Sequence, residues 1–238
     1  MRNRILMALP DGERAALEQR LDRCRHRVRD PVYRQGERIK SVVFPLTGVF
    51  SLVAQSDHAR PVEIATVGSE GFVGLPVFLQ ATLTGAHMAY SQVEGEALRM
   101  DAAEFLDVIN HAPALRSVLQ RYAMALMTQI ARGAACNRIH SIEQRAARWL
   151  LQTHDRVDGD RFLLTDSFLA QMLGEPAGAV RRAVEPLAAV LAFDGEHATI
   201  LDRGGLERAS CDCYWIVREE YDRLLGTVNA CPSRSESR

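Results

Sequence analysis

The stretch 164–201 restricts the fold of this chain more than any other segment. Thr165 is a good N-cap for the amphipathic segment 166–173, and Gly174 supplies a tight turn after it. Pro176 suits the first turn of a second helix, where a missing N–H costs nothing. The apolar side chains of that second helix recur at helical spacing, at Val180, Val184 and Leu187.

Two short apolar runs, 190–193 and 196–201, follow this helix pair and are joined by Asp194-Gly195. An Asp-Gly pair between two such runs is a strong signal for a β-hairpin. Helix, turn, helix and hairpin together predict a winged helix, whose second helix would lie in the major groove of DNA.

The segment 31–100 has a different pattern. Short runs rich in Val, Ile and Phe are separated by Gly, Pro and Asp, and they predict strands at 41–44, 49–54, 62–67 and 97–100. Strands at such close intervals indicate a β-sandwich or barrel. Helices are expected on either side of it, at 10–23 with Asp11 as the cap and at 102–110 with Asp101 as the cap.

A longer helix is predicted from Pro113 to about Ser141, and another over 142–155. The apolar positions of the longer helix are Leu115, Val118, Leu119, Tyr122, Leu126 and Ile130. A long amphipathic helix between two domains is a natural dimer seam, because a symmetric partner would bury the stripe. The alternative is that the helix packs on its own domain. We expect the dimer.

Composition excludes several classes of protein. No window of 18 uninterrupted apolar residues occurs, and the N-terminus carries acidic and basic residues without a cleavage site, so we expect a cytoplasmic protein without a membrane span or signal peptide. Charge is asymmetric: residues 1–140 carry +3, and residues 141–238 carry −4. The acidic half is the predicted DNA-binding half, which disfavours strong non-specific DNA affinity.

The five cysteines show neither a disulfide framework nor a Cys-x-x-Cys pair. Cys211 and Cys213 are interpreted as an ordinary reduced pair, because neither their spacing nor a nearby His completes a four-ligand set. We therefore expect no metal site and no cofactor. No Ser-His-Asp set or phosphate loop can be assembled either, so we expect no enzyme activity and no catalytic residue.

Several stretches resemble the Crp/Fnr family of bacterial transcription regulators, and they follow the family's order along nearly the whole chain. They are ILMALP (5–10), YRQGE (33–37), VVFPLTGVFSLV (42–53), VEIATVGSEGFVGLP (62–76), EQRAARWLLQTHDRV (143–157), LTDSFLAQMLG (164–174), ILDRGGLE (200–207) and CDCY (211–214).

The resemblance implies an α+β chain that binds promoter DNA as a homodimer. Its parts are expected to be a cyclic-nucleotide-binding-like jelly-roll sensor over 1–110, a dimerisation helix over 111–140, a winged helix-turn-helix over 141–225 and a flexible tail over 226–238. An interaction with RNA polymerase stays open, as does a haem held by His26, His87 or His111.

The effector pocket departs from the family pattern. Members that bind cyclic AMP carry Gly-Glu, then Arg-Ser or Arg-Thr about ten residues on; Glu accepts from the ribose hydroxyl while Arg and the hydroxyl hold the phosphate. The matching positions here are Gly74-Leu75 and Ala86-His87. We expect a degenerate pocket that does not bind cyclic AMP in the usual mode, and the effector stays unknown.

The second helix departs from the family as well. Its first turn, 175–179, offers Glu, Pro, Ala and Gly, and Pro186 should bend or end the helix near Glu185. DNA contacts are expected from Arg181 and Arg182, from Thr165 as a phosphate-contacting cap, and from Arg203 near the wing. The leading hypothesis is a transcription regulator; the alternative is a protein-interaction module of the same fold with impaired DNA binding.

Overall fold

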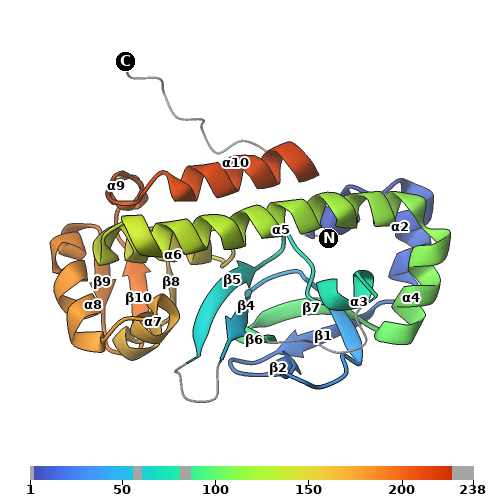
Figure 1. Cartoon of the computed structure of the whole chain (residues 1–238), viewed down its shortest axis with the longest axis horizontal. Helices are drawn as coiled ribbons and strands as arrows, with labels where there is room; N and C mark the ends of the chain where they lie inside the picture. Colours follow the sequence, from blue (N-terminus) through green and yellow to red (C-terminus); the bar gives the residue numbers. More distant parts are fainter. Residues whose placement is uncertain (1–2, 56–60, 81–86, 227–238) are drawn as a thin grey trace.

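The computed structural model describes residues 3–55, 61–80 and 87–226. A β-rich unit and a C-terminal helical unit are connected by one long helix (Figure 1). This helix, α5 (Pro113–Ile139), runs from the β-rich unit to the C-terminal helical unit. None of the helices in these ranges is long and apolar enough to cross a membrane.

The β-rich unit consists of two antiparallel sheets. The first has the order β1 (Asp22–His26), β7 (Gly95–Asp101), β3 (Ser41–Pro45). The second has the order β2 (Pro31–Tyr33), β6 (His87–Val93), β4 (Val49–Ala54), β5 (Val62–Val67). The four strands predicted from sequence are confirmed. Aromatic side chains fill the interior: the ring of Phe72 lies 4.9 Å from that of Phe44 and 5.2 Å from that of Phe105.

Short helices flank the sheets: α1 (Arg4–Met7), α2 (Asp11–Glu18), α3 (Leu75–Phe78) and α4 (Ala102–His111). Asp101 caps α4 as predicted, accepting from the N–H of Ala103 at 2.7 Å. The predicted helix over 10–23 is too long, because the chain enters β1 at Asp22. Asp11 lies in the first turn of α2, and Pro10 occupies the cap position.

The predicted dimer stripe on α5 is buried within its own chain. Leu115, Leu119 and Tyr122 are fully buried, Val118 and Leu126 nearly so, and the Tyr122 hydroxyl donates to the carbonyl of Phe72. Only Ile130, 37% exposed, is open to solvent. The prediction that this stripe forms the dimer seam is therefore wrong for every residue but Ile130, because the sensor core already covers the other five.

The C-terminal unit is the predicted winged helix. Its elements are α6 (Ile142–His154), β8 (Arg161–Leu163), α7 (Asp166–Leu173), α8 (Ala177–Val184), the 3-10 helix η1 (Glu185–Ala189), β9 (Leu191–Phe193), β10 (His197–Ile200) and α9 (Arg203–Ala209). Thr165 caps α7, accepting from the N–H of Phe168, and Gly174 has φ of +69°, as the predicted turn requires. The hairpin forms, with β8 as a third strand that sequence analysis missed.

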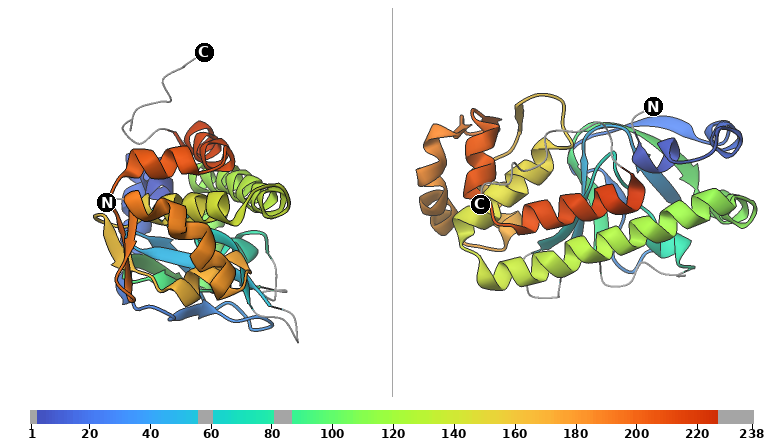
Figure 2. Two further views of the ribbon diagram at one scale, coloured as in Figure 1. Left: turned by 90° about the vertical axis from the view of Figure 1, so that its left-hand side faces the viewer. Right: turned by 90° about the horizontal axis from the view of Figure 1, so that it is seen from above.

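The last helix, α10 (Cys213–Leu225), lies alongside α5 (Figure 2). Its side chains Val217, Tyr221 and Leu225 join the sensor core, whereas Tyr214 joins the core of the winged helix. Most of the final helix of the predicted unit 141–225 therefore packs on the β-rich unit. Beyond Gly226, the predicted tail lies outside the described residues.

Candidate nucleic-acid interface and domain contacts

A buried arginine holds the turn between α7 and α8 in place. Arg145, only 4% exposed, donates to Oε1 of Glu175 at 2.7 Å and to the carbonyl of Leu173 at 2.6 Å. The charge of Glu175 is thereby paired, and its carboxylate fixes the approach to α8.

The exposed face of α8 carries two arginines over a first turn without hydrogen-bonding side chains. Arg181 and Arg182 are both exposed, and Nε of Arg181 lies 3.6 Å from Oδ2 of Asp166, in the first turn of α7. A Cβ at Gly178 would lie 3.8 Å from the Arg182 guanidinium, so Arg182 extends back along the first turn. Arg181 therefore lies near the start of α7, next to the cap Thr165, and Arg182 lies over the first turn of α8.

The prediction that Pro186 ends the second helix near Glu185 is confirmed. Helix α8 ends at Val184, and the chain continues as the 3-10 helix η1 with Pro186 in its first turn. A proline lacks the N–H that an α-helical turn would use, and its ring clashes with the preceding turn. Helix α8 is consequently only about two turns long.

Arg203 does not belong to this surface. Its guanidinium bonds to four side chains, with distances of 2.9 Å to Glu207, 2.8 Å to Nδ1 of His154, 2.6 Å to Asp155 and 2.6 Å to the Tyr214 hydroxyl. These bonds fasten the start of α9 to the end of α6 and to α10. The sequence predicted Arg203 as a DNA contact near the wing, whereas these four bonds give it partners within the chain.

The acidic wing tip has a cationic partner that sequence analysis missed. Arg161, on β8, lies 2.7 Å from Oδ2 of Asp194, and this bond holds the pKa of Asp194 well below its usual range. Asp194 also accepts from the N–H groups of Glu196 and His197. Its carboxylate therefore shapes the hairpin, while Arg161 is 58% exposed and offers a positive charge at the wing.

The residues of the predicted effector pocket have other partners. Gly74 has φ of +138° and precedes α3, and a Cβ there would meet Val42 at 2.6 Å, so the position requires glycine. Leu75 packs against the sensor core. His87 shares a hydrogen bond with the Tyr33 hydroxyl at 3.1 Å, and burial lowers the pKa of this imidazole. Ala86 lies outside the described residues.

The three histidines considered for haem also have protein partners. His26 lies 2.8 Å from the Ser91 hydroxyl through Nδ1 and 3.2 Å from the Thr47 carbonyl through Nε2. Nδ1 of His111 lies 3.0 Å from the carbonyl of Asp107. Together with the His87–Tyr33 bond, these contacts assign each imidazole a structural partner.

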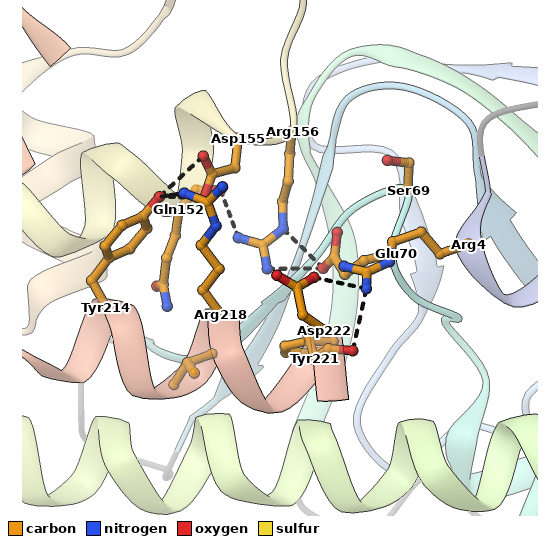
Figure 3. A pocket seen from close by; sticks show the side chains of 11 residues that line it. Arg4, Ser69, Glu70, Gln152, Asp155, Arg156, Tyr214, Arg218, Tyr221 and Asp222 are labelled. Atoms are coloured by element: carbon orange, nitrogen blue, oxygen red, sulfur yellow. Dashed lines mark hydrogen bonds and ion pairs between the residues drawn. The ribbon is translucent and has the colours of Figure 1, made fainter. Parts of the chain in front are cut away.

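A polar cavity of about 260 Å³ lies where the sensor, the end of α6 and α10 meet (Figure 3). Arg156, from the loop after α6, points across it to Glu70 of the sensor at 2.8 Å; the two side chains are 7% and 12% exposed. Despite the burial of Glu70, the charge of Arg156 and its hydrogen bond lower the pKa of that carboxyl. Arg4 pairs with Asp222 of α10 at 2.9 Å on the cavity's other side.

A second contact joins the two units at Glu63 on β5. Trp149 of α6 donates from Nε1 to Oε1 of Glu63 at 2.7 Å, and Ser51 donates to the other oxygen at 2.6 Å. Burial raises the pKa of Glu63 to about 7, although both hydrogen bonds oppose the shift. Glu63 and Glu70 therefore both connect the sensor to the winged helix.

The statement that no nearby His completes a four-ligand set around Cys211 and Cys213 is wrong. Cys136 and His140, at the end of α5, lie beside them, and one ligand atom from each of the four residues falls within 4.8 Å of the others. The signal available in the sequence was the four-residue spacing of Cys136 and His140, which places both on one helix face.

These features define a fold class: a jelly-roll domain, a long connecting helix and a winged helix. The chain has the fold of the Crp/Fnr family transcription regulators. No family model and no curated protein matches it in sequence.

Solved structures resemble it over most of its length. FixK2 from Bradyrhizobium japonicum has a TM-score of 0.65 at 15% identity, covering 80% of this chain and 98% of its own. The c-di-GMP responsive global regulator CLP from Xanthomonas campestris has a TM-score of 0.64 at 18% identity, with coverages of 81% and 100%. A transcriptional regulator of the Crp/Fnr family from Eubacterium rectale has a TM-score of 0.65 at 12% identity, with coverages of 84% and 94%.

Proposed function

We propose that this chain is a dimeric transcription regulator that binds promoter DNA through α8 and the wing. The observation that carries the proposal is the position of Arg181 and Arg182, exposed on the second helix of a winged helix-turn-helix. An arginine in the major groove can donate two hydrogen bonds to guanine, worth about 1–3 kcal/mol of discrimination. We expect Thr165 at the start of α7 and Arg161 at the wing to contact phosphates.

The proposed dimer uses the side of α5 that faces away from the sensor. Met124 and Met127 are 49% and 57% exposed, and Ala131 continues the same face at three- to four-residue spacing. Exposed apolar side chains along a connecting helix are typical of a helix-to-helix seam, and small residues let the backbones approach. The seam therefore lies on a different face from the one the sequence predicted.

The proposed signal passes through the contacts between the units. The residues that would hold cyclic AMP are replaced by Leu75, Ala86 and His87 in the sequence, so we infer a degenerate sensor for another signal or for none. Any movement of β5 would reach α6 through the Glu63–Trp149 bond, and any movement of the loop at Glu70 would reach it through Arg156. An equilibrium between two arrangements of these contacts would couple sensor and reading head.

The test is a fluorescence anisotropy titration of the full chain against promoter fragments at two salt concentrations. We expect specific binding that Arg182→Ala weakens about 5- to 150-fold, by the loss of one arginine–base contact. Arg23→Ala, which removes an exposed arginine of the sensor, is the control and should leave the affinity unchanged.

The same titration decides the alternative function. The acidic C-terminal half and the bland first turn of α8 favour a module that regulates through protein contacts instead. A folded dimer that binds no duplex even at low salt would support that alternative. Equal affinity for promoter and random duplex, unchanged by Arg182→Ala, would likewise count against sequence-specific reading.

A further inference from the structure

Three cysteines and one histidine meet where the connecting helix ends and the last helix begins. Cys136 and His140 lie one turn apart at the end of α5, and the backbone N–H of His140 bonds to the Cys136 carbonyl at 3.1 Å. Cys211 lies between α9 and α10, and Cys213 is the first residue of α10. The sulfurs of Cys136, Cys211 and Cys213 are buried together, apart from both hydrophobic cores.

All four ligand atoms lie within 4.8 Å of one another, and two of their separations are close to the edge of a tetrahedron around one metal ion. The sulfurs of Cys136 and Cys211 are 3.5 Å apart, and Cys213 Sγ lies 3.7 Å from Nδ1 of His140. With Zn–S bonds of about 2.3 Å, the corresponding edge of a tetrahedron measures about 3.8 Å. A separation of 3.5 Å is also well beyond the roughly 2.05 Å of a disulfide, so the pair is not bonded.

The surroundings also suit a zinc–thiolate centre. Nε2 of His140 lies 3.7 Å from Oδ1 of Asp212, while Nδ1 faces the sulfurs. A carboxylate behind the distal nitrogen of a ligand histidine is a recurrent feature of metal sites, because it fixes the ring and its tautomer. Three thiolates and a neutral imidazole around Zn²⁺ carry a net charge of −1, and the guanidinium of Arg148 lies beside Cys136 to offset it.

We propose that Cys136, His140, Cys211 and Cys213 form a structural Zn²⁺ site that fastens the end of α5 to the start of α10. All four positions of the ion would be filled by protein, which is typical of structural rather than catalytic zinc. An iron–sulfur cluster divides its ligands among several irons and so holds them further apart than this set. The site adjoins Ser141, the cap of α6, and thus controls the joint between the connecting helix and the winged helix.

The first experiment measures metal content in the full chain purified under reducing conditions. We expect about one zinc per chain by plasma mass spectrometry. We also expect Co²⁺ added to the metal-free protein to give the intense visible bands of a tetrahedral thiolate site. Cys136→Ser, Cys211→Ser, Cys213→Ser and His140→Ala should each lower retained zinc, whereas Cys24→Ser, a cysteine of the sensor, should keep it.

A variant at the protein surface keeps the proposal testable if a variant of a ligand residue misfolds. The Asp212 side chain is 64% exposed, so Asp212→Asn should fold normally and weaken zinc affinity about 10- to 100-fold in a chelator competition. The proposal is overturned by folded, reduced protein that retains no zinc after loading with excess Zn²⁺. It is equally overturned by iron–sulfur absorption, by a Cys136–Cys211 disulfide in the reduced preparation, or by equal zinc loss in Cys24→Ser.

Discussion

The indole of Trp149 donates a 2.7 Å hydrogen bond to a carboxylate oxygen of Glu63, and this bond joins α6 of the winged helix to β5 of the sensor. Ser51 donates to the other oxygen of the same group. The carboxylate is thus placed between two donors from different units. Its environment raises its pKa to about 7 because burial disfavours the charged form.

The raised pKa of Glu63 predicts stability that falls as pH rises. The folded chain holds the Glu63 proton up to about pH 7, whereas the unfolded chain releases it near pH 4.5, so folding stability decreases between these values. Glu63→Gln keeps an acceptor for Trp149 and should remove this part of the decrease. Urea unfolding at pH 5 and pH 8 measures it, with the exposed Glu219→Gln as a control that retains the wild-type slope.

The ion pair of Arg156 and Glu70 predicts a large asymmetry between single and double variants. Arg156→Met leaves Glu70 buried without its partner, which should cost about 3–5 kcal/mol of unfolding free energy. Arg156→Met with Glu70→Gln removes both charges and should recover much of that loss. Chemical denaturation measures both, and a double variant no more stable than the single one would argue that the pair does not form.

The revised dimer seam predicts opposite effects for two faces of one helix. Leu119→Ala opens a cavity in the sensor core and should lower the unfolding free energy by about 2–5 kcal/mol while the dimer persists. Met127→Asp should leave the fold intact but shift the protein to monomer. Sedimentation equilibrium separates the two, and Leu79→Asp, an exposed apolar position on the sensor, is the control that should remain dimeric.

Local signals in the sequence were sufficient for the elements. Thr165, Gly174 and Asp194-Gly195 each determine a cap or turn through their own backbone and side chain, so the winged helix could be predicted without knowing its surroundings. Pro186 ended α8 for the same reason. The resemblance to Crp/Fnr regulators then placed these elements in order, and the structural neighbours bear it out.

Contacts between distant segments could not be predicted in this way. The apolar stripe at Leu119 and Tyr122 predicts a buried helix face. Spacing alone does not determine whether a partner chain or the chain's own sensor buries this face. The position of Arg203 in the sequence suggested a wing residue, because its bond to Tyr214 of α10 depends on tertiary packing. Cys136 and Cys211 are 75 residues apart in sequence, and their contact likewise depends on the packing of α10 against α5.

The cysteine–histidine cluster predicts that removing metal loosens the C-terminal helix. A structural ion binds the folded chain but not the unfolded one, so its loss lowers stability by the free energy of binding. Excess chelator should therefore lower the thermal midpoint of the wild-type protein by several degrees and increase amide exchange at the start of α10. Cys213→Ser should already have the lower midpoint and show no response to chelator, whereas Cys24→Ser should respond like the wild type. A wild-type midpoint that chelator leaves unchanged, after metal loss is verified, would mean that the four side chains do not need an ion to hold α5 and α10 together.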